Sequence, residues 1–348
     1  MRPWLPRRVL VTPSARDWAH GLQMLERAER LGIAVVELKT DRIVMDRQVD
    51  ERRAYADAKA TLAIVVAPPS KRKLEPIAPS ADWRVDLAAG CPAHCGYCYL
   101  AGSLKGPPIT RVYANLDEIF GAIPAYIGNG TITSRSAARS HEGTTFEASC
   151  YTDPLAIEHL TGSLARTIAW FGRTEGAQLR FTTKFADVGP LLALDHGGHT
   201  RMRASINPST YARFEGGTAP VAARLAALKQ MADAGYPVGL TIAPIIAADG
   251  WEQAYRGLIA DVATLFADVV DLTIELITHR FNPGSKAVLD TWYPGSALDM
   301  TTTNRTIKRT KFGTEKTVYD APTMKRLRSV FEAEIAAALP LARILYWT

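Results

Sequence analysis

Three of the four cysteines lie within eight residues, in the segment CPAHCGYCY that runs from Cys91 to Tyr99. The spacing is C-x3-C-x2-C, and a short loop of this kind can wrap three thiolates around one face of a cubane iron–sulfur cluster. The fourth iron is then left without a protein ligand, as a reactive metal centre requires. The spacing predicts a catalytic [4Fe-4S] cluster on Cys91, Cys95 and Cys98.

The open iron of such a cluster can chelate the amino and carboxylate groups of S-adenosylmethionine (SAM). An electron from the reduced cluster then cleaves the sulfonium to give a 5′-deoxyadenosyl radical, so the cofactor pair supplies the chemistry. The alternative is a zinc site that uses the three cysteines with Cys150 or His94, but the paired C-x2-C knuckles of most zinc sites are missing. Cysteines this few and this clustered do not suit a disulfide framework, which favours a reducing compartment.

Alternating strand and helix patterns predict how this motif is positioned. An opening βαβ-like region has strands at residues 8–12 and 33–38 and a helix at 15–31, and we expect it to end near residue 80. Beyond it, strands are expected at residues 83–87, 145–148, 179–183, 202–206, 238–243 and 271–276, with helices such as 154–171 and 220–234 between them. About six such repeats predict an α/β fold, a partial (β/α)6 barrel of the TIM type over residues 81–348, with chemistry at the carboxyl ends of its strands.

Two further segments carry mostly polar side chains. Residues 128–145 are rich in Gly, Ser, Thr and Arg and are expected to form an exposed loop. Residues 305–320 alternate basic, β-branched and aromatic types around Gly313, which predicts a C-terminal β-hairpin with a basic face. Such a hairpin is either a solvated surface element or a contact for an anionic partner.

Composition and charge narrow the class of protein. The net charge of +6 and pI near 9.1 favour anionic partners such as nucleic acid, although an ordinary basic surface has the same charge. The longest apolar run, residues 62–68, is far shorter than the roughly 20 residues that span a bilayer, so no membrane association is expected. The N-terminal segment is too short and too interrupted for a secretion signal, which predicts a cytoplasmic protein.

The cysteine motif, with its aromatic residue before the last cysteine, is similar to the signature of the radical SAM superfamily. Over residues 82–320 the chain resembles the spore photoproduct lyase family, through the successive segments CPAHCGYCYLAGSLKG, TRVYANLDEIF, FEASCYTDPLAIEHLT, LRFTTKF, RMRASINP, AGYPVGLTIAPI and ELITHRF. The resemblance implies the radical SAM type of partial barrel. It also implies a lyase that reverses the spore photoproduct, 5-thyminyl-5,6-dihydrothymine, directly to two thymines in DNA.

The resemblance further implies a mechanism and its residues. The deoxyadenosyl radical removes a hydrogen atom from C6 of the dihydrothymine half, and the methylene bridge then breaks by β-scission. Cys150, the cysteine outside the motif, returns a hydrogen atom to the remaining allylic radical. The resulting thiyl radical is reduced through Tyr97 and Tyr99.

For SAM, the family pattern places Tyr99 near the adenine, and the other pocket residues at successive strand ends are Thr152, Lys184, Ser205 and Ala243. Lys184 can pair with the SAM carboxylate, and hydroxyl groups can hold its ribose or amino group. Threonine at position 152 departs from the serine that is common in the family, but it keeps the hydroxyl group.

For the substrate, the family has an Arg-Tyr pair before a glycine in the hairpin, where this chain has Lys311 and Phe312. Lysine loses the bidentate geometry on phosphate and phenylalanine loses a hydroxyl, but charge and stacking survive. His279 and Arg280 follow a predicted strand and are interpreted as substrate contacts. The expected partners are DNA that contains a thymine dimer lesion and an electron donor such as ferredoxin or flavodoxin, with the enzyme a monomer.

Two other hypotheses remain open. A radical SAM enzyme of the same fold could act on a different substrate, such as a modified nucleotide, RNA or a peptide. A non-enzymatic nucleic-acid-binding protein could use the cysteines for a structural Fe–S or zinc site. Metal content and a lesion-repair assay separate the three.

Overall fold

The computed structural model describes residues 3–45, 50–103, 107–133, 136–137, 139–309 and 315–348. The chain divides into two compact units. Unit 1 comprises residues 1–92, 104–202 and 234–236. Unit 2 comprises residues 93–103, 203–233 and 237–348.

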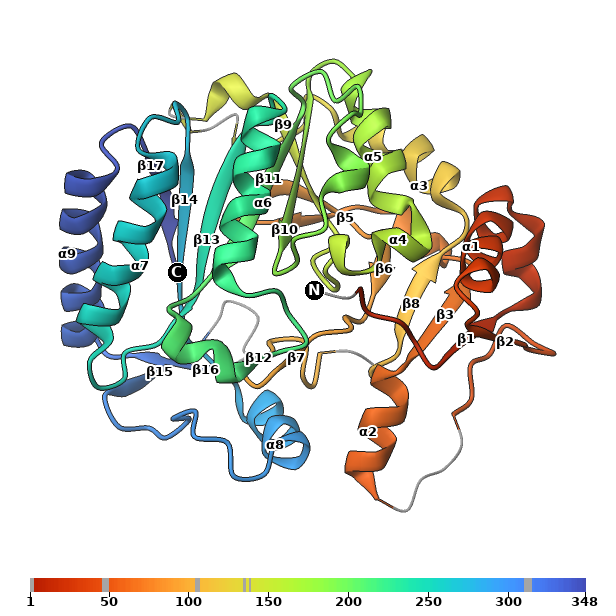
Figure 1. Cartoon of the computed structure of the whole chain (residues 1–348), viewed down its shortest axis with the longest axis horizontal. Helices are drawn as coiled ribbons and strands as arrows, with labels where there is room; N and C mark the ends of the chain where they lie inside the picture. The colour runs from red at the N-terminus through yellow and green to blue at the C-terminus, as the bar shows by residue number, and fades with distance from the viewer. Residues whose placement is uncertain (1–2, 46–49, 104–106, 134–135, 138, 310–314) are drawn as a thin grey trace. The chain divides into compact units, whose positions relative to one another are not determined.

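Unit 1 opens with an α/β sheet whose strands run in the order β2-β1-β3-β8-β6 (Figure 1). Its parallel strands are β1 (Arg8–Val11), β2 (Ala34–Glu37), β3 (Thr61–Val65) and β8 (Thr110–Tyr113), and β6 (Ala88–Ala89) is antiparallel to β8. The opening strands and helix are confirmed, with α1 at Ala19–Arg30 after a 3₁₀ turn at Pro13–Asp17. Since β8 and β6 come after residue 80, this sheet extends past the predicted boundary, and the division at residue 80 stays a prediction.

A second group of strands in unit 1 carries one part of the expected site. The antiparallel strand β4 (Glu75–Ile77) pairs with β5 (Ala81–Val85), and β5 is followed by parallel β9 (Thr144–Ala148) and β10 (Ala177–Thr183). Every residue of β9 is buried, as expected for a parallel strand that is covered on both faces. The rings of Phe146 on β9 and Phe171 on α5 lie 5.4 Å apart in this core. The other helices of the unit are α2 (Glu51–Lys59), α3 (Leu116–Ala122), α4 (Glu158–Thr161) and α5 (Ser163–Gly172).

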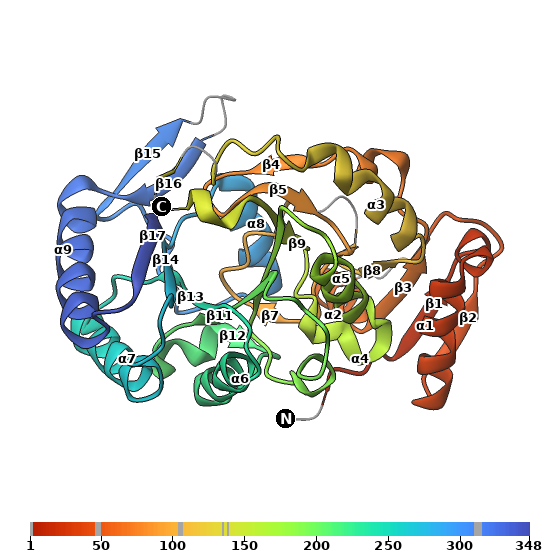
Figure 2. The same ribbon diagram turned by 90° about the horizontal axis from the view of Figure 1, so that it is seen from above.

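Unit 2 contains the parallel strands β13 (Val238–Ile245), β14 (Thr273–Thr278) and β17 (Arg343–Trp347). Helices α7 (Trp251–Phe266) and α9 (Ala321–Ala338) lie side by side next to β14 and β17 (Figure 2), with the rings of Tyr255 and Phe331 5.0 Å apart. The remaining helices are α6 (Val221–Asp233) and α8 (Pro283–Trp292). Short antiparallel pairs join β7 (His94–Cys95) to β12 (Glu215–Gly216) and β15 (Arg305–Arg309) to β16 (Glu315–Tyr319), and the latter pair forms the predicted hairpin.

The strand β11 (Thr200–Ile206) contributes residues to both units, and all seven are buried. The six strands predicted after residue 82 are thus present, each with both ends within two residues of the prediction. The predicted helix at 154–171 is interrupted at Gly162, whose left-handed conformation (φ +63°) separates α4 from α5.

The prediction of an exposed loop at residues 128–145 is wrong for several of its members. Thr133 and Glu142 are buried, and Arg139 is only 5% exposed. Arg139 donates to the backbone carbonyls of Pro79 and Ser80 at 2.9 Å each and forms an ion pair with Glu142. The segment was predicted to be exposed because its residues are polar. Inside the unit, however, these polar groups form hydrogen bonds and ion pairs that replace their contacts with water. Among the residues described, no helix is both long and apolar enough to cross a membrane.

Candidate radical SAM site

In unit 2, backbone hydrogen bonds hold the second half of the cysteine motif. Cys95 lies on β7 opposite Glu215 of β12, and the amide of Gly96 donates to the Phe214 carbonyl at 2.8 Å. The amide of Cys98 donates to the Cys95 carbonyl at 3.1 Å, which closes a turn. Both thiols are half-buried. The loop is therefore shaped by main-chain pairing.

Tyr97 is the centre of a buried polar network in unit 2. Its hydroxyl donates to the Glu215 carboxylate, which also accepts from the Arg224 guanidinium at 2.6 Å. Burial is the largest cause that raises the pKa of Tyr97 well above its ordinary value, and the charges of Cys95 and Glu215 add to it. Tyr97 is thus held as a neutral phenol with a fixed proton acceptor. Tyr99, by contrast, is 65% exposed.

In unit 1, the first cysteine follows the short strand β6. The ammonium group of Lys59 donates to the Cys91 carbonyl. The preceding residue, Gly90, has φ +89°, and a Cβ there would lie 2.2 Å from the Ile109 carbonyl oxygen. Only glycine fits this position, and the chain therefore enters the motif along a fixed path.

Cys150 lies in a tight turn, Ser149–Thr152, directly after β9. Ser149 has a left-handed backbone (φ +57°), and its amide donates to the Val85 carbonyl at 2.7 Å. Its hydroxyl accepts from the Leu87 amide at 3.0 Å, and the Thr152 amide donates to the Ser149 carbonyl at 3.0 Å. The turn, called the Cys150 turn below, presents a half-buried thiol at the carboxyl end of a strand.

The end of the Cys150 turn offers groups that suit a polar cofactor. The buried Thr152 hydroxyl has no hydrogen-bond partner among the described residues, as expected for a group that binds a ligand such as SAM. Asp153 accepts from the Thr183 hydroxyl and from the Lys184 amide, both at 2.7 Å, and so connects the ends of β9 and β10. Thr152 and Lys184 thus belong to neighbouring strand ends of unit 1, and this arrangement fits the predicted cofactor.

The other predicted SAM residues belong to unit 2. Ser205 is buried near the end of β11, and its carbonyl accepts from Arg224 at 2.8 Å. Ala243 is half-buried on β13. Both lie in the last part of their strands, where the fold predicts function.

The predicted substrate residues differ in their surroundings. His279 is buried in unit 2, and its Nδ1 accepts from the Arg305 guanidinium at 2.9 Å. Burial lowers the pKa of His279 to about 3, with a further contribution from the charge of Arg305, so the ring is neutral. Arg280 is exposed, whereas Lys311 and Phe312 lie outside the described residues.

The described part of the hairpin is basic. Lys308 and Lys316 are directly opposite each other on β15 and β16, and both are exposed. Burial lowers the pKa of Lys316, and the neighbouring charge of Arg280 lowers it further. Like charges directly opposite each other destabilise a strand pair, and a bound anion would relieve this repulsion.

Several residues of the site could not be found from the sequence. Glu215 and Arg224 were missed because neither is in the cysteine segment, and their contacts with Tyr97 and with each other form only when the chain has folded. Among the described residues, no group of three His, Cys, Asp or Glu side chains is arranged to hold a metal ion. The cluster and the zinc alternative therefore both stay predictions from cysteine spacing.

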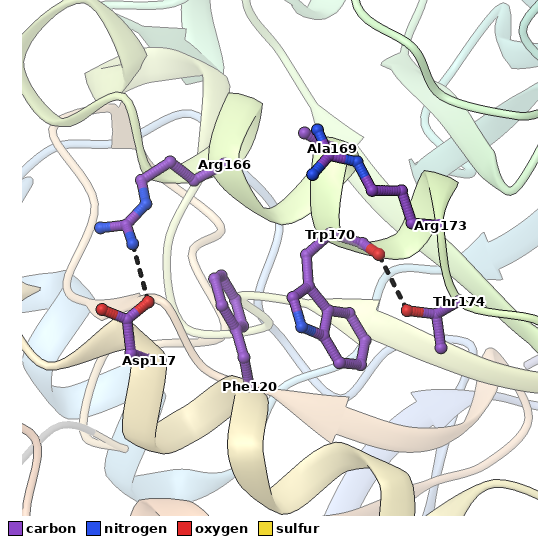
Figure 3. A pocket seen from close by; sticks show the side chains of 7 residues that line it. All are labelled: Asp117, Phe120, Arg166, Ala169, Trp170, Arg173 and Thr174. Atoms are coloured by element: carbon purple, nitrogen blue, oxygen red, sulfur yellow. Dashed lines mark hydrogen bonds and ion pairs between the residues drawn. The ribbon is translucent and has the colours of Figure 1, made fainter.

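One open pocket of about 490 Å³ lies elsewhere in unit 1, between α3 and α5 (Figure 3). Phe120 and Trp170 stack in it with ring centroids 5.7 Å apart, and Arg166 forms an ion pair with Asp117 at 2.7 Å. Arg173 completes its rim. None of the predicted site residues lines this pocket.

Comparisons with known proteins extend over nearly the whole chain. A curated spore photoproduct lyase from Geobacillus sp. (strain Y412MC61) is 38% identical over 353 residues, with 100% of both chains covered. The Bacillus subtilis (strain 168) spore photoproduct lyase is 36% identical, with 99% of each chain covered. A solved structure of a doubly substituted spore photoproduct lyase, with bound AdoMet and dinucleoside spore photoproduct, superposes with a TM-score of 0.92 at 36% identity and full coverage of both chains.

This structural similarity confirms the predicted α/β partial-barrel fold. The family model for spore photoproduct lyase matches residues 4–348. By sequence and by fold, the chain belongs to the spore photoproduct lyase family.

Proposed function

We propose that this chain repairs the spore photoproduct in DNA by direct reversal to two thymines, using SAM and a [4Fe-4S] cluster on Cys91, Cys95 and Cys98. The observation that carries the proposal is the likeness, over its full length, to a solved lyase with bound AdoMet and dinucleoside spore photoproduct. The site residues, the cluster and the electron donor rest on sequence spacing and on the local geometry of each unit.

When bound, the cluster and SAM supply the radical that removes the hydrogen atom from C6 of the lesion. Cys150 then acts as the hydrogen donor: its S–H bond breaks, a C–H bond forms on the allylic thymine radical, and the sulfur is left as a thiyl radical. A half-buried thiol on a rigid turn suits this step, because the reacting atoms must be held close and aligned.

Tyr97 and Tyr99 are the proposed reductants of that thiyl radical. The hydrogen bond from Tyr97 to Glu215 gives the phenolic proton a defined acceptor when the ring is oxidised. Tyr99 is the more exposed of the two and is also the proposed neighbour of the adenine.

Cofactor binding is assigned to Thr152, Lys184, Ser205 and Ala243, and the strongest support is the Thr152 hydroxyl, which has no hydrogen-bond partner within the described part of the chain. On the substrate side, Lys308, Lys316 and Arg280 form a basic surface that suits DNA phosphates. Lys311, Phe312 and His279 are kept as proposed substrate contacts. A ferredoxin or flavodoxin as electron donor, a monomeric state and a cytoplasmic location complete the proposal.

The decisive test is repair of a defined lesion. The cluster is reconstituted anaerobically, SAM, dithionite and a spore photoproduct dinucleotide are added, and thymidylyl-thymidine is followed by chromatography and mass spectrometry. We expect clean product from the wild type and loss of clean product from Cys150→Ala. Steady formation of deoxyadenosine without repair would instead favour another substrate, and a colourless, zinc-loaded protein would contradict the enzyme proposal.

A further inference from the structure

Tyr151, the residue directly after Cys150, is held through three of its groups within unit 1. Its hydroxyl accepts from Arg84 Nη1 at 3.0 Å, and the guanidinium carbon of Arg84 lies 4.4 Å from the centroid of its ring. The Lys71 ammonium lies 5.5 Å from the same centroid. Its carbonyl accepts from the Gly90 amide at 2.8 Å. Side chain and main chain of this residue are thus both anchored.

The two cations that hold the ring are themselves fixed by carboxylates. Asp86, which is buried, accepts from Lys71 at 2.6 Å and lies 3.2 Å from Arg84 Nε. Glu75 lies 2.9 Å from Arg84 Nη2. Two positive and two negative charges therefore balance, and because Asp86 and Arg84 are largely out of solvent, this network resists rearrangement.

Arg84 also interacts electrostatically with the thiol. Burial is the largest single influence on the pKa of Arg84 and lowers it, but the charges of Asp86, Tyr151, Glu75 and Cys150 together outweigh burial, so the pKa is raised. The network that holds Tyr151 therefore lies near the sulfur of Cys150 as well.

The anchors of the Cys150 turn converge on one segment of the chain. Ser149, before the thiol, is bonded to Val85 and Leu87, and Tyr151, after it, is bonded to Gly90. These three partners lie in residues 85–90, immediately before Cys91. The sulfur of Cys150 thus sits between two residues fixed to the segment that leads into the cysteine motif.

We propose that Tyr151, clamped by Arg84 and Lys71, is a positioning residue for the Cys150 thiol in hydrogen return. The inference rests on the proposed function of Cys150 and deepens it. Hydrogen return needs the sulfur close to the substrate carbon, and a displacement of about 1 Å can slow such a step by roughly 100-fold. If hydrogen return is slowed, the substrate radical persists longer and reacts with the dithionite in solution instead of with Cys150.

The first test separates hydrogen return from the steps before it. Tyr151→Leu removes the ring and hydroxyl, while Tyr151→Phe removes only the hydroxyl bond to Arg84. For Tyr151→Leu we expect lesion consumption within about twofold of the wild type but a fall of roughly tenfold in the ratio of clean thymine product to reductant-trapped product. Tyr151→Phe should give an intermediate ratio.

Tyr126→Phe is the matched control in the same unit. The Tyr126 hydroxyl accepts from the Leu74 amide at 3.0 Å, and its ring packs against Trp83 on β5 with centroids 4.7 Å apart. It is a packed, hydrogen-bonded tyrosine that is not attached to the Cys150 turn. Its product ratio should equal that of the wild type.

A second measurement needs no cofactor and covers the case in which Tyr151→Leu folds poorly. The rate of alkylation of Cys150 in the native protein is followed by peptide mass spectrometry after short exposure to iodoacetamide. Because Cys150 is half-buried on a rigid turn, loosening the clamp should speed alkylation several-fold in Tyr151→Phe and leave it unchanged in Tyr126→Phe.

The outcomes separate this inference from the proposed function. Clean product retained by Cys150→Ala would reject Cys150 as donor. Loss of clean product in Cys150→Ala with wild-type ratios and alkylation rates in both Tyr151 variants would reject only the clamp. Equal losses of lesion consumption and clean product in the Tyr151 variants would also reject positioning, since that pattern reports a general structural defect.

Discussion

Among single residues, Glu215 is expected to contribute strongly to the free energy of unfolding, through its buried ion pair with Arg224. Both side chains are almost fully enclosed, and Arg224 donates to Glu215 at 2.6 Å. Glu215→Gln leaves the guanidinium without a counter-charge, which should lower the free energy of unfolding by about 3–5 kcal/mol. Urea unfolding of the apo protein measures the change.

The exposed ion pair of Lys229 with Asp233 on α6 is the control for this experiment. Asp233→Asn should change the free energy of unfolding by less than about 1 kcal/mol, because solvent screens exposed pairs. If Glu215→Gln and Asp233→Asn lower the free energy of unfolding equally, burial of the Glu215–Arg224 pair does not increase its contribution to stability.

His279 predicts a pH dependence of stability. Its pKa is lowered from 6.5 to about 3, mainly by burial, so the folded ring stays neutral where the unfolded ring gains a proton. The folded state therefore has its full stability above about pH 6.5 and loses stability as the pH falls toward 3, by about 2 kcal/mol at pH 5.

His279→Gln should abolish this contribution while glutamine keeps an oxygen that can accept from Arg305. The quantity to compare is the difference in unfolding free energy between variant and wild type, at about pH 7.5 and pH 5. The lowered pKa of buried His20 affects both proteins equally and cancels. If the difference in unfolding free energy between the wild type and His279→Gln is the same at both pH values, His279 is not the source of the pH dependence.

The residues that the sequence revealed are those whose spacing alone carries chemistry. Three cysteines within eight positions are recognisable without a fold. Glu215 is 118 positions from its partner Tyr97, and such a contact exists only after β7 and β12 have paired. Tyr151 was missed for the same reason, because Lys71 and Arg84 reach it from another part of the chain.

At the scale of elements, the start of α5 depends on one buried carboxylate. Glu158 accepts from the Leu164 amide at 2.8 Å and from the Ala165 amide at 3.0 Å, in place of a capping residue at Gly162. Glu158→Ala should lower the free energy of unfolding by about 1–2 kcal/mol, as for loss of a helix cap. Glu158→Gln, which keeps an acceptor, should cost less, and equal losses in chemical denaturation would count against capping.

Strands were predicted better than the segments that connect them. Largely apolar runs such as residues 238–243 stay buried in a parallel sheet, so local pattern suffices to find them. The loop at 128–145 was predicted as exposed because its residues are polar, yet Arg139 and Thr133 are enclosed by partners distant in sequence. The sequence pattern indicates whether a residue prefers water. It does not indicate which protein groups will form hydrogen bonds with that residue when it is buried.

At the scale of the whole molecule, net positive charge and a basic hairpin predict salt-dependent DNA binding. Lys308→Gln and Lys316→Gln should each reduce the slope of log affinity against log salt by about 1, because each removes a cation that pairs with one phosphate. Binding of a lesion-containing oligonucleotide over about 50–200 mM salt measures the slope. Lys325→Gln, at an exposed position of α9, should leave it unchanged, and equal effects at all three positions would point to nonspecific charge instead.

The opposed lysines of the hairpin have a second consequence, for colloidal behaviour. In this two-stranded ribbon Thr317 of β16 already pairs with Phe281, whereas the outer edge of β15, which carries exposed Ile307, is where another ribbon could add a strand. Lys308 and Lys316 place two like charges at this ribbon, so two copies that approach edge to edge repel each other. The charge that we propose for contact with DNA phosphates is therefore expected to reduce aggregation as well, and apolar residues at these two positions should weaken both effects.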